Sequence, residues 1–440
     1  MTAREGFLAL ADALCRGLAS GEELYLRLDG EDSDFVRVSR ANIRQAGTVA
    51  QRRLALALVV GARQAESTVD LGGDPVEDAR CAGEVLARLR SLLPLLPEDP
   101  FLHWHRGDQR EERCATELPP DATATVATAL DAATGLDLVG LWASGTMHAG
   151  FASSHGQRAW HSAQACSFDW SCHRPDGQAV KGLHAGRTWD ATAWRSAMAQ
   201  ARGDLQRFDL PRRRIKPGSY RTYLAPAAVH ELVGLLSWGG FSVRSRQTRS
   251  SPLMRLESGQ ASLSPLLSLV EDAASGLAPL VTKHGFRRAD RVVLIDCGSC
   301  GEALVSARSA REYGLVVNAG DEAPASLRMA AGALPAADAL RSLGRGLWIG
   351  NLHYLNYSDS SACRVTGMTR FACWWVEDGV PVAPIEHLRF DDTLFNLFGA
   401  QLEALTCERE LIPDTSTYDG RSLSTAEVPG ALVREMRFTL

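Results

Sequence analysis

The chain begins with apolar positions three or four residues apart, namely Phe7, Leu10, Leu14 and Leu18. This spacing places them on one face of a helix. Apolar and polar residues then alternate in three segments, at 24–28, 35–38 and 54–60, with a turn expected at 30–34. A period of two predicts strands that bury one face. We therefore expect a helix packed against an antiparallel meander.

Asp74 with Pro75 begins a helix that runs to about Leu93 and belongs to this first unit. A second unit of the same kind follows, and Asp121 caps an alanine-rich helix that ends at Gly135. Four strand-like segments and a closing helix come next, at 136–143, 149–154, 158–170, 178–184 and 189–201.

Prolines and basic residues at 211–218 interrupt every periodic pattern and mark the clearest domain boundary. We therefore expect one α+β unit over 1–110, a second over 111–214 and a third domain over 219–440.

The third domain is the richest in aromatic and β-branched residues. Its segments 346–357, 363–376 and 380–382 predict an antiparallel meander, and 431–438 predicts a further paired strand. Helices are expected at 226–238 and from Phe390 through Leu405. The predicted fold class is α+β, with N-terminal helix-on-antiparallel-sheet units before a large, mostly antiparallel β domain.

Composition and charge argue against several classes of function. The net charge is -5, from 47 basic and 52 acidic residues, which argues against a nucleic-acid surface. The first residues lack a signal-peptide pattern, and no apolar run approaches the roughly 18 residues that a membrane span needs. Ten cysteines in such a chain are expected to be reduced thiols. A cytoplasmic protein without a membrane partner is expected.

Few motifs suggest chemistry. His148, His155, His161, His173 and His184 match no metal-ligand spacing, so structural roles are expected for them. Neither a phosphate-binding glycine loop nor a GxSxG elbow occurs. Cys297 and Cys300 form a CxxC motif, which leaves a thiol redox function open, although two unreactive thiols are the preferred interpretation.

Three segments carry a resemblance to a known family. They are RGLWIGNLHYLNYSD at 345–359, TGMTRFACWWVEDG at 366–379 and APIEHLRF at 383–390. Their order closely resembles the C-terminal region of the TldD/PmbA family, the so-called modulators of DNA gyrase. Within that family the chain looks like the TldE/PmbA branch. The resemblance implies a subunit that pairs with a TldD chain in a cytosolic zinc protease, in which TldD holds the metal and performs the chemistry.

The helix expected at 226–238 carries the residues that matter most. In the TldD branch it bears His-Glu, three further residues and a second His, so that two imidazoles bind zinc and the Glu serves as base. Here His230 and Glu231 are present, but Leu235 stands at the second His position. Leucine has no lone pair to donate, so the motif is degenerate and no catalytic residue is expected in this chain.

Cys373 is the other residue that the resemblance singles out, because it falls where the TldD pattern places its thiolate ligand. A pair of His230 and Cys373 is at most a weak metal site, and a core cysteine is the simpler interpretation.

The main hypothesis is a non-catalytic TldE/PmbA-like subunit of a heteromeric zinc metalloprotease that degrades or trims unfolded peptides. It would shape a chamber and hold extended peptide by backbone hydrogen bonds. Zinc is expected in the TldD-like partner and no cofactor in this chain. The alternatives are a self-sufficient metallohydrolase that uses His230, Glu231 and Cys373, and a thiol redox protein. The sequence assigns no peptide-binding residues and leaves open whether the isolated chain forms a homodimer.

Overall fold

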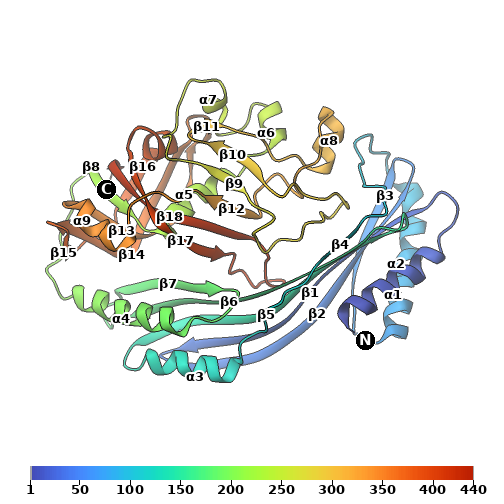
Figure 1. The fold of residues 1–440 in the computed structure, drawn as a ribbon, viewed down its shortest axis with the longest axis horizontal. Helices are drawn as coiled ribbons and strands as arrows, with labels where there is room; N and C mark the ends of the chain where they lie inside the picture. The colour runs from blue at the N-terminus through green and yellow to red at the C-terminus, as the bar shows by residue number, and fades with distance from the viewer. Residues whose placement is uncertain (1, 440) are drawn as a thin grey trace.

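A computed structural model describes residues 2–439. Two large sheets dominate it, one from each half of the chain (Figure 1). The N-terminal sheet has the order β3-β2-β1-β5-β6-β4, and β7 pairs with β6. Its strands are β1 (Glu23–Ser39), β2 (Asn42–Val60), β3 (Arg63–Asp70), β4 (Arg110–Arg113), β5 (Asp137–Ser153), β6 (Arg158–His173) and β7 (Ala179–Gly186).

Residues 1–110 and 111–214, expected as two units, contribute strands to this same sheet. Strand β1 pairs antiparallel with β2 on one side and with β5 on the other. The turn expected at 30–34 is wrong, because Glu23–Ser39 is one uninterrupted strand. The polar positions Glu31 and Ser33 are buried within it. They are tolerated there because Arg421, from the other half of the chain, donates hydrogen bonds to both side chains.

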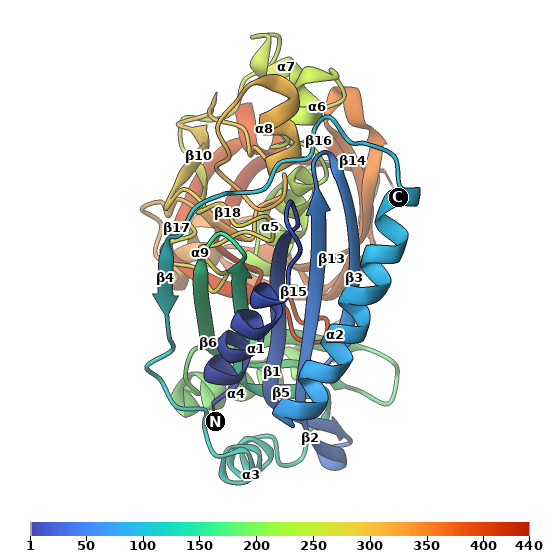
Figure 2. The same ribbon diagram turned by 90° about the vertical axis from the view of Figure 1, so that its right-hand side faces the viewer.

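Four helices cover the N-terminal sheet, with α1 (Ala3–Arg16) and α2 (Pro75–Leu92) at one end and α3 (Ala122–Ala132) and α4 (Ala191–Arg207) at the other (Figures 1 and 2). The predicted caps are confirmed, since Asp74 and Asp121 accept hydrogen bonds from the first turns of α2 and α3. The leucines of β1 and β2 pack under α1 and α2, as the alternation predicts.

The C-terminal sheet has eleven strands in the main order β11-β10-β9-β12-β18-β16-β14-β13-β8, with β15 beside β14 and β17 beside β18. Most pairs are antiparallel, and β12–β18 and β13–β8 are parallel. Its strands are β8 (Gly218–Leu224), β9 (Leu269–Glu271), β10 (Val292–Asp296), β11 (Ser299–Cys300), β12 (Ser326–Met329), β13 (Gly346–Asp359), β14 (Arg364–Glu377), β15 (Val380–Pro384), β16 (Arg389–Thr393), β17 (Leu402–Pro413) and β18 (Thr425–Phe438).

The expected α+β class with a large β domain is confirmed, and so is the meander β13-β14-β15. The helix expected from Phe390 through Leu405 is wrong. Residues 389–393 form β16 against β14, a short π-helix covers Asn396–Ala400, and β17 follows. The apolar side chains of this segment still enter the core, but sheet pairing decides their backbone conformation.

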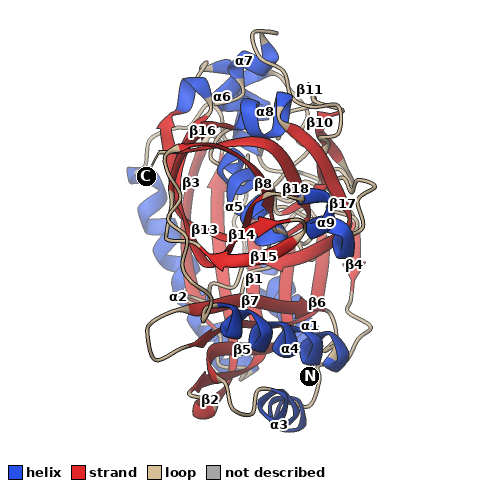
Figure 3. Ribbon diagram, turned by 90° about the vertical axis from the view of Figure 1, so that its left-hand side faces the viewer, coloured by secondary structure: helices blue, strands red, loops and turns tan. Residues whose placement is uncertain are grey.

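The tail strand β18 is paired, as expected, and lies inside the sheet rather than at its edge. It runs antiparallel to β8, so that Gly218 faces Phe438. The helices of this half are α5 (Pro226–Gly234), α6 (Val243–Gln247), α7 (Met254–Glu257), α8 (Ala307–Tyr313) and α9 (Ala339–Leu343). Figure 3 shows α5 inside the curve of the C-terminal strands. None of the helices within residues 2–439 has the length and hydrophobicity needed to cross a membrane.

Candidate functional site

Helix α5 carries the degenerate motif. It begins with Pro226 in its first turn, where the missing N–H costs nothing. Its apolar residues Ala228, Val229, Leu232 and Val233 are buried in the core of the C-terminal domain. His230 and Glu231 fall between these positions, so they lie away from that core, with His230 partly buried and Glu231 exposed.

His230 is confined but has little to bind to. Its Nδ1 is buried and has no hydrogen-bond partner among the described protein groups. Burial lowers the pKa of His230, and the charge of Asp414 opposes this only in part. The imidazole is therefore neutral at neutral pH and retains a lone pair that could bind a metal or accept a hydrogen bond.

Leu235, which stands where the sequence resemblance places the second ligand of a TldD chain, belongs to the hydrophobic core. It is 3% exposed and begins the 3-10 turn Leu235–Ser237 that follows α5. Its carbonyl accepts a hydrogen bond of 2.9 Å from the hydroxyl of Tyr357. This hydrogen bond fixes the backbone at Leu235, whose aliphatic side chain has no atom that could bind a metal.

Cys373 lies on β14 and is also buried. Its thiol faces backbone groups of the β13–β14 hairpin, and its Sγ is 3.4 Å from the carbonyl oxygen of Arg370. Burial raises the pKa of Cys373 to about 11, so the thiol is protonated at neutral pH. A metal ion bound at Cys373 would have to displace the proton of this buried thiol.

These residues do not fit a zinc ion. Within residues 2–439 no group of three or more His, Cys, Asp or Glu side chains gathers closely enough to hold a metal. A catalytic zinc site needs three protein ligands and an open position, and a self-sufficient hydrolase that uses His230, Glu231 and Cys373 would need a third ligand from elsewhere. The described part of the chain brings none to them.

The β13–β14 hairpin has two strained bulges. Tyr354 on β13 and Phe371 on β14 have φ of 53° and 60°, and the register between the strands shifts beside each of them. The left-handed conformation costs a non-glycine residue roughly 1–2 kcal/mol. Such outliers cluster at functional sites, and nothing in the sequence identifies these two, because aromatic residues favour ordinary strands.

Four charged or titratable residues gather around this hairpin from both halves of the chain. The charge of Lys181 on β7 acts on the pKa of Glu231 on α5 and on that of His353 on β13, and the charge of Arg370 on β14 also acts on His353. Although Glu231 is exposed, desolvation raises its pKa, while desolvation lowers that of His353. The hairpin therefore presents polar and cationic groups where β7 approaches β14.

The CxxC motif is part of a β-hairpin. Cys297 and Gly298, with φ of 44° and 79°, form the two-residue turn between β10 and β11, in which Asp296 pairs with Ser299. All ten cysteines lie within the described residues and all are free. Burial raises the pKa of Cys300, the opposite of what a reactive thiol needs. The geometry thus gives no support to a redox pair.

The five histidines between positions 148 and 184 have separate surroundings and do not form a cluster. His148 contacts Asp32, His155 contacts Glu23, and His173 contacts Ser171, while His184 packs edge-on against Trp189. His161 is different, because it lines a pocket that its position in the sequence does not reveal.

The fold and the site define an α+β protein with a helix inside a curved antiparallel sheet, where the helix carries His230 and Glu231. Residues 217–440 match the family model described as the PmbA/TldA metallopeptidase C-terminal domain. Since that match spans half of the sequence, the chain belongs to the PmbA/TldD family of metallopeptidase type. No curated protein sequence matches it significantly.

Solved structures share the whole fold at low sequence identity. TldE from Thermococcus kodakarensis is 14% identical with a TM-score of 0.80, over 99% of this chain and 100% of that one. A candidate modulator of a DNA gyrase from Thermotoga maritima is 13% identical with a TM-score of 0.76, over 100% of both chains. A candidate modulator of DNA gyrase from Bacteroides thetaiotaomicron is 14% identical with a TM-score of 0.74, over 99% of this chain and 98% of that one.

Proposed function

We propose that this chain is a non-catalytic, TldE-like subunit of a heteromeric zinc metalloprotease whose metal and chemistry reside in a TldD-like partner. The observation that carries the proposal is Leu235, which is buried where a second imidazole would have to stand. The lack of a group of three donor side chains within residues 2–439 supports it. Family membership supplies the reaction class, hydrolysis of peptides.

We propose that the role of this chain is to form part of the reaction chamber and to hold unfolded or extended peptide. The β13–β14 hairpin suits that role, because its bulges leave Tyr354 77% exposed, with its ring tilted against that of His353. An extended peptide offers one N–H and one C=O per residue, and a strand can bind these groups whatever the peptide sequence. The free thiols suit the cytoplasmic location that we propose.

The first test measures zinc and proteolysis in the purified chain and in a mixture with the TldD-like chain of the same source. The chain alone should hold substoichiometric zinc and leave unfolded casein intact, whereas the mixture should contain zinc and cleave casein. His230→Ala should change neither the zinc content nor the activity of the mixture, like the control His387→Ala, which alters an exposed histidine.

The outcome that contradicts the proposal is specific. Stoichiometric zinc in the isolated chain, lost in His230→Ala or Cys373→Ala but kept in His387→Ala, would assign the metal site to this subunit. Cleavage of casein by the isolated chain, abolished in His230→Ala, would lead to the same conclusion.

A further inference from the structure

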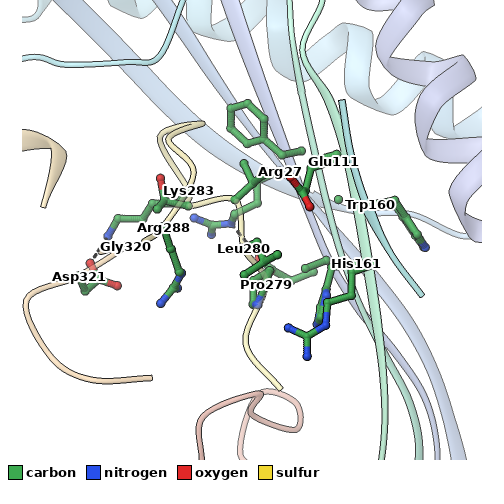
Figure 4. Close-up of a pocket in the computed structure, with 18 residues that line it drawn as sticks. Arg27, Glu111, Trp160, His161, Pro279, Leu280, Lys283, Arg288, Gly320 and Asp321 are labelled. Carbon is green, nitrogen blue, oxygen red and sulfur yellow. Dashed lines mark hydrogen bonds and ion pairs between the residues drawn. The ribbon is translucent and has the colours of Figure 1, made fainter. Parts of the chain in front are cut away.

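A pocket of about 280 Å³ lies between the N-terminal sheet and loops of the C-terminal domain (Figure 4). Strands β1, β4, β5 and β6 form one wall, and the segment 279–283 with Arg288, Gly320 and Asp321 forms the other. A water molecule occupies about 30 Å³ in the liquid, so the pocket has room for a small polar ligand with some of its water. None of its lining residues belongs to the degenerate motif on α5.

His161 lines this pocket and carries a buried ring nitrogen without a hydrogen-bond partner within residues 2–439. The residue is 5% exposed, and its Nε2 is 2.7 Å from the carbonyl oxygen of Leu277. A carbonyl can only accept, so Nε2 carries the hydrogen and Nδ1 retains the lone pair. Burial lowers the pKa of His161 to about 4, which keeps the ring neutral at neutral pH. Nδ1 is buried without a partner among the described protein groups, so it requires a donor from a ligand or from water.

The pocket also contains two guanidinium groups that are incompletely paired. Arg113 donates to the carbonyl oxygens of Ala273 and Gly276, at 3.1 and 2.8 Å, and forms no ion pair within residues 2–439. Arg288 has a side chain only 13% exposed and a buried Nε without a hydrogen bond. Its ion-pair partner, Glu271, is 3.6 Å away, which is too long for a hydrogen bond.

The acids of the pocket are occupied by other cations. Asp29 pairs with Arg27 at 2.9 Å and Asp321 with Lys283 at 2.9 Å, and Figure 4 shows the latter pair across the pocket from His161. Glu111 pairs with Arg287 at 3.3 Å. Arg113 therefore has no acidic partner within residues 2–439, and Arg288, which faces Glu271 without a hydrogen bond, still has a guanidinium N–H to donate.

We infer that this pocket binds a small oxyanion that carries its own O–H group, with monohydrogen phosphate as the simplest example. The guanidinium groups of Arg113 and Arg288 attract the anionic oxygens. Nδ1 of His161 accepts the hydrogen bond from the protonated oxygen. Sulfate has the same shape and charge but no proton at neutral pH, so it would leave Nδ1 unsatisfied. The site should therefore prefer phosphate to sulfate.

The experiment is isothermal titration of the full chain at pH 7 and constant ionic strength with inorganic phosphate, sulfate or glycerol phosphate. Phosphate should bind saturably and sulfate about tenfold more weakly, the ratio expected for one hydrogen bond to a charged group. Binding of glycerol phosphate with equal affinity would indicate a phosphoryl headgroup as the natural ligand, and its failure to bind would indicate free phosphate.

Two substitutions of His161 separate its two nitrogens. His161→Gln can keep the donor to Leu277 but removes the acceptor at the Nδ1 position, so the preference for phosphate should vanish. His161→Asn places an oxygen near the Nδ1 position and should keep that preference. Arg113→Gln should weaken the binding of both anions. Arg37→Gln, which alters an exposed arginine outside the pocket, should change neither affinity.

Near-UV circular dichroism establishes that each variant is folded. Equal affinities for phosphate and sulfate in the wild-type chain, saturable binding of neither, or an unchanged preference in folded His161→Gln would each overturn the inference. None of these outcomes depends on zinc or on peptide cleavage, so the inference stands or falls separately from the proposed function.

Discussion

The N-terminal sheet meets the C-terminal domain at two polar places that are completed differently. At Arg421 the C-terminal domain supplies the donors, because its guanidinium reaches the Ser33 hydroxyl and the carbonyl oxygens of Gly145 and Ala165, at 3.3, 3.2 and 2.7 Å. One oxygen of Glu31 keeps no hydrogen bond, but the charge of Arg421 lies close to it. At His161 the same domain supplies only an acceptor, the carbonyl of Leu277, and one ring nitrogen remains without a partner.

The difference teaches how to distinguish a structural contact from a site for a ligand. Buried polar groups are nearly always paired, so a contact that serves only to join two domains should pair them within the protein. The guanidinium of Arg421 meets this expectation, although one oxygen of Glu31 beside it does not, whereas Nδ1 of His161 has no hydrogen-bond or acidic partner within residues 2–439. Three changes test the comparison.

The largest effect is expected at Arg421. Arg421→Leu removes three hydrogen bonds from a charged donor and should lower the free energy of unfolding by about 2–4 kcal/mol. Urea denaturation at pH 7 measures this change. Arg37→Leu, on the exposed face of the same strand that Arg421 contacts, should stay within about 0.5 kcal/mol of wild type. Equal effects of the two variants would show that Arg421 does not join the domains.

The second effect is a pH dependence of the stability, caused by buried histidines at and near the pocket. His161, and His284 next to the pocket residue Lys283 in the sequence, have a pKa lowered from 6.5 to about 4, mainly by burial. Between these values the unfolded chain binds more protons than the folded one, so stability should fall as the pH drops from about 6.5 towards 4. Each histidine should contribute roughly 2–3 kcal/mol to this loss.

Urea denaturation at pH 7 and pH 5 measures this dependence, and His161→Gln should remove part of it. An identical pH dependence in the variant would mean that His161 does not titrate as its burial indicates.

The smallest effect is expected at the strained hairpin. Tyr354→Gly relieves the left-handed strain of an exposed residue, and the gain of roughly 1–2 kcal/mol is largely offset by the flexibility of glycine in the unfolded chain. The variant should therefore be as stable as wild type or up to about 1 kcal/mol more stable. The control Asn356→Gly lies on the same strand without a positive φ and should lose about 0.5–1 kcal/mol. A larger loss of stability in Tyr354→Gly than in the control would contradict the interpretation that Tyr354 is strained.

Local patterns predicted much of the fold. The caps at Asp74 and Asp121, the alternation in β2 and the meander at 346–384 depend on neighbouring residues, and all are found in the structure. The turn expected at 30–34 failed for a non-local reason, because Arg421 stabilises polar residues that look like a loop. The prediction of a helix from Phe390 failed because the same spacing of apolar residues also suits β16 and β17, whose side chains enter the same curved core.

For the candidate site, too, the sequence could predict local features but not those that depend on distant segments. The sequence could show Leu235 in place of a ligand, because a motif is read along the chain. It could not show the bulges at Tyr354 and Phe371, because their conformations depend on strand register. Nor could it show the pocket at His161, whose walls come from segments more than a hundred residues apart. The Cys297–Gly298 turn could have been predicted, since glycine at the second position of a two-residue turn is a common hairpin signal.

The pairing of β8 with β18 has a consequence for the architecture of the C-terminal domain. Because Gly218 faces Phe438, the domain is entered and left at neighbouring points of one sheet. A domain with adjoining ends can be spliced into another polypeptide, or its chain order rearranged by a short bridge between those ends, without disturbing the remaining strands. The curved sheet around α5 is nevertheless joined to the N-terminal sheet, because Trp374 and Leu432 share a buried hydrophobic cluster with Trp142.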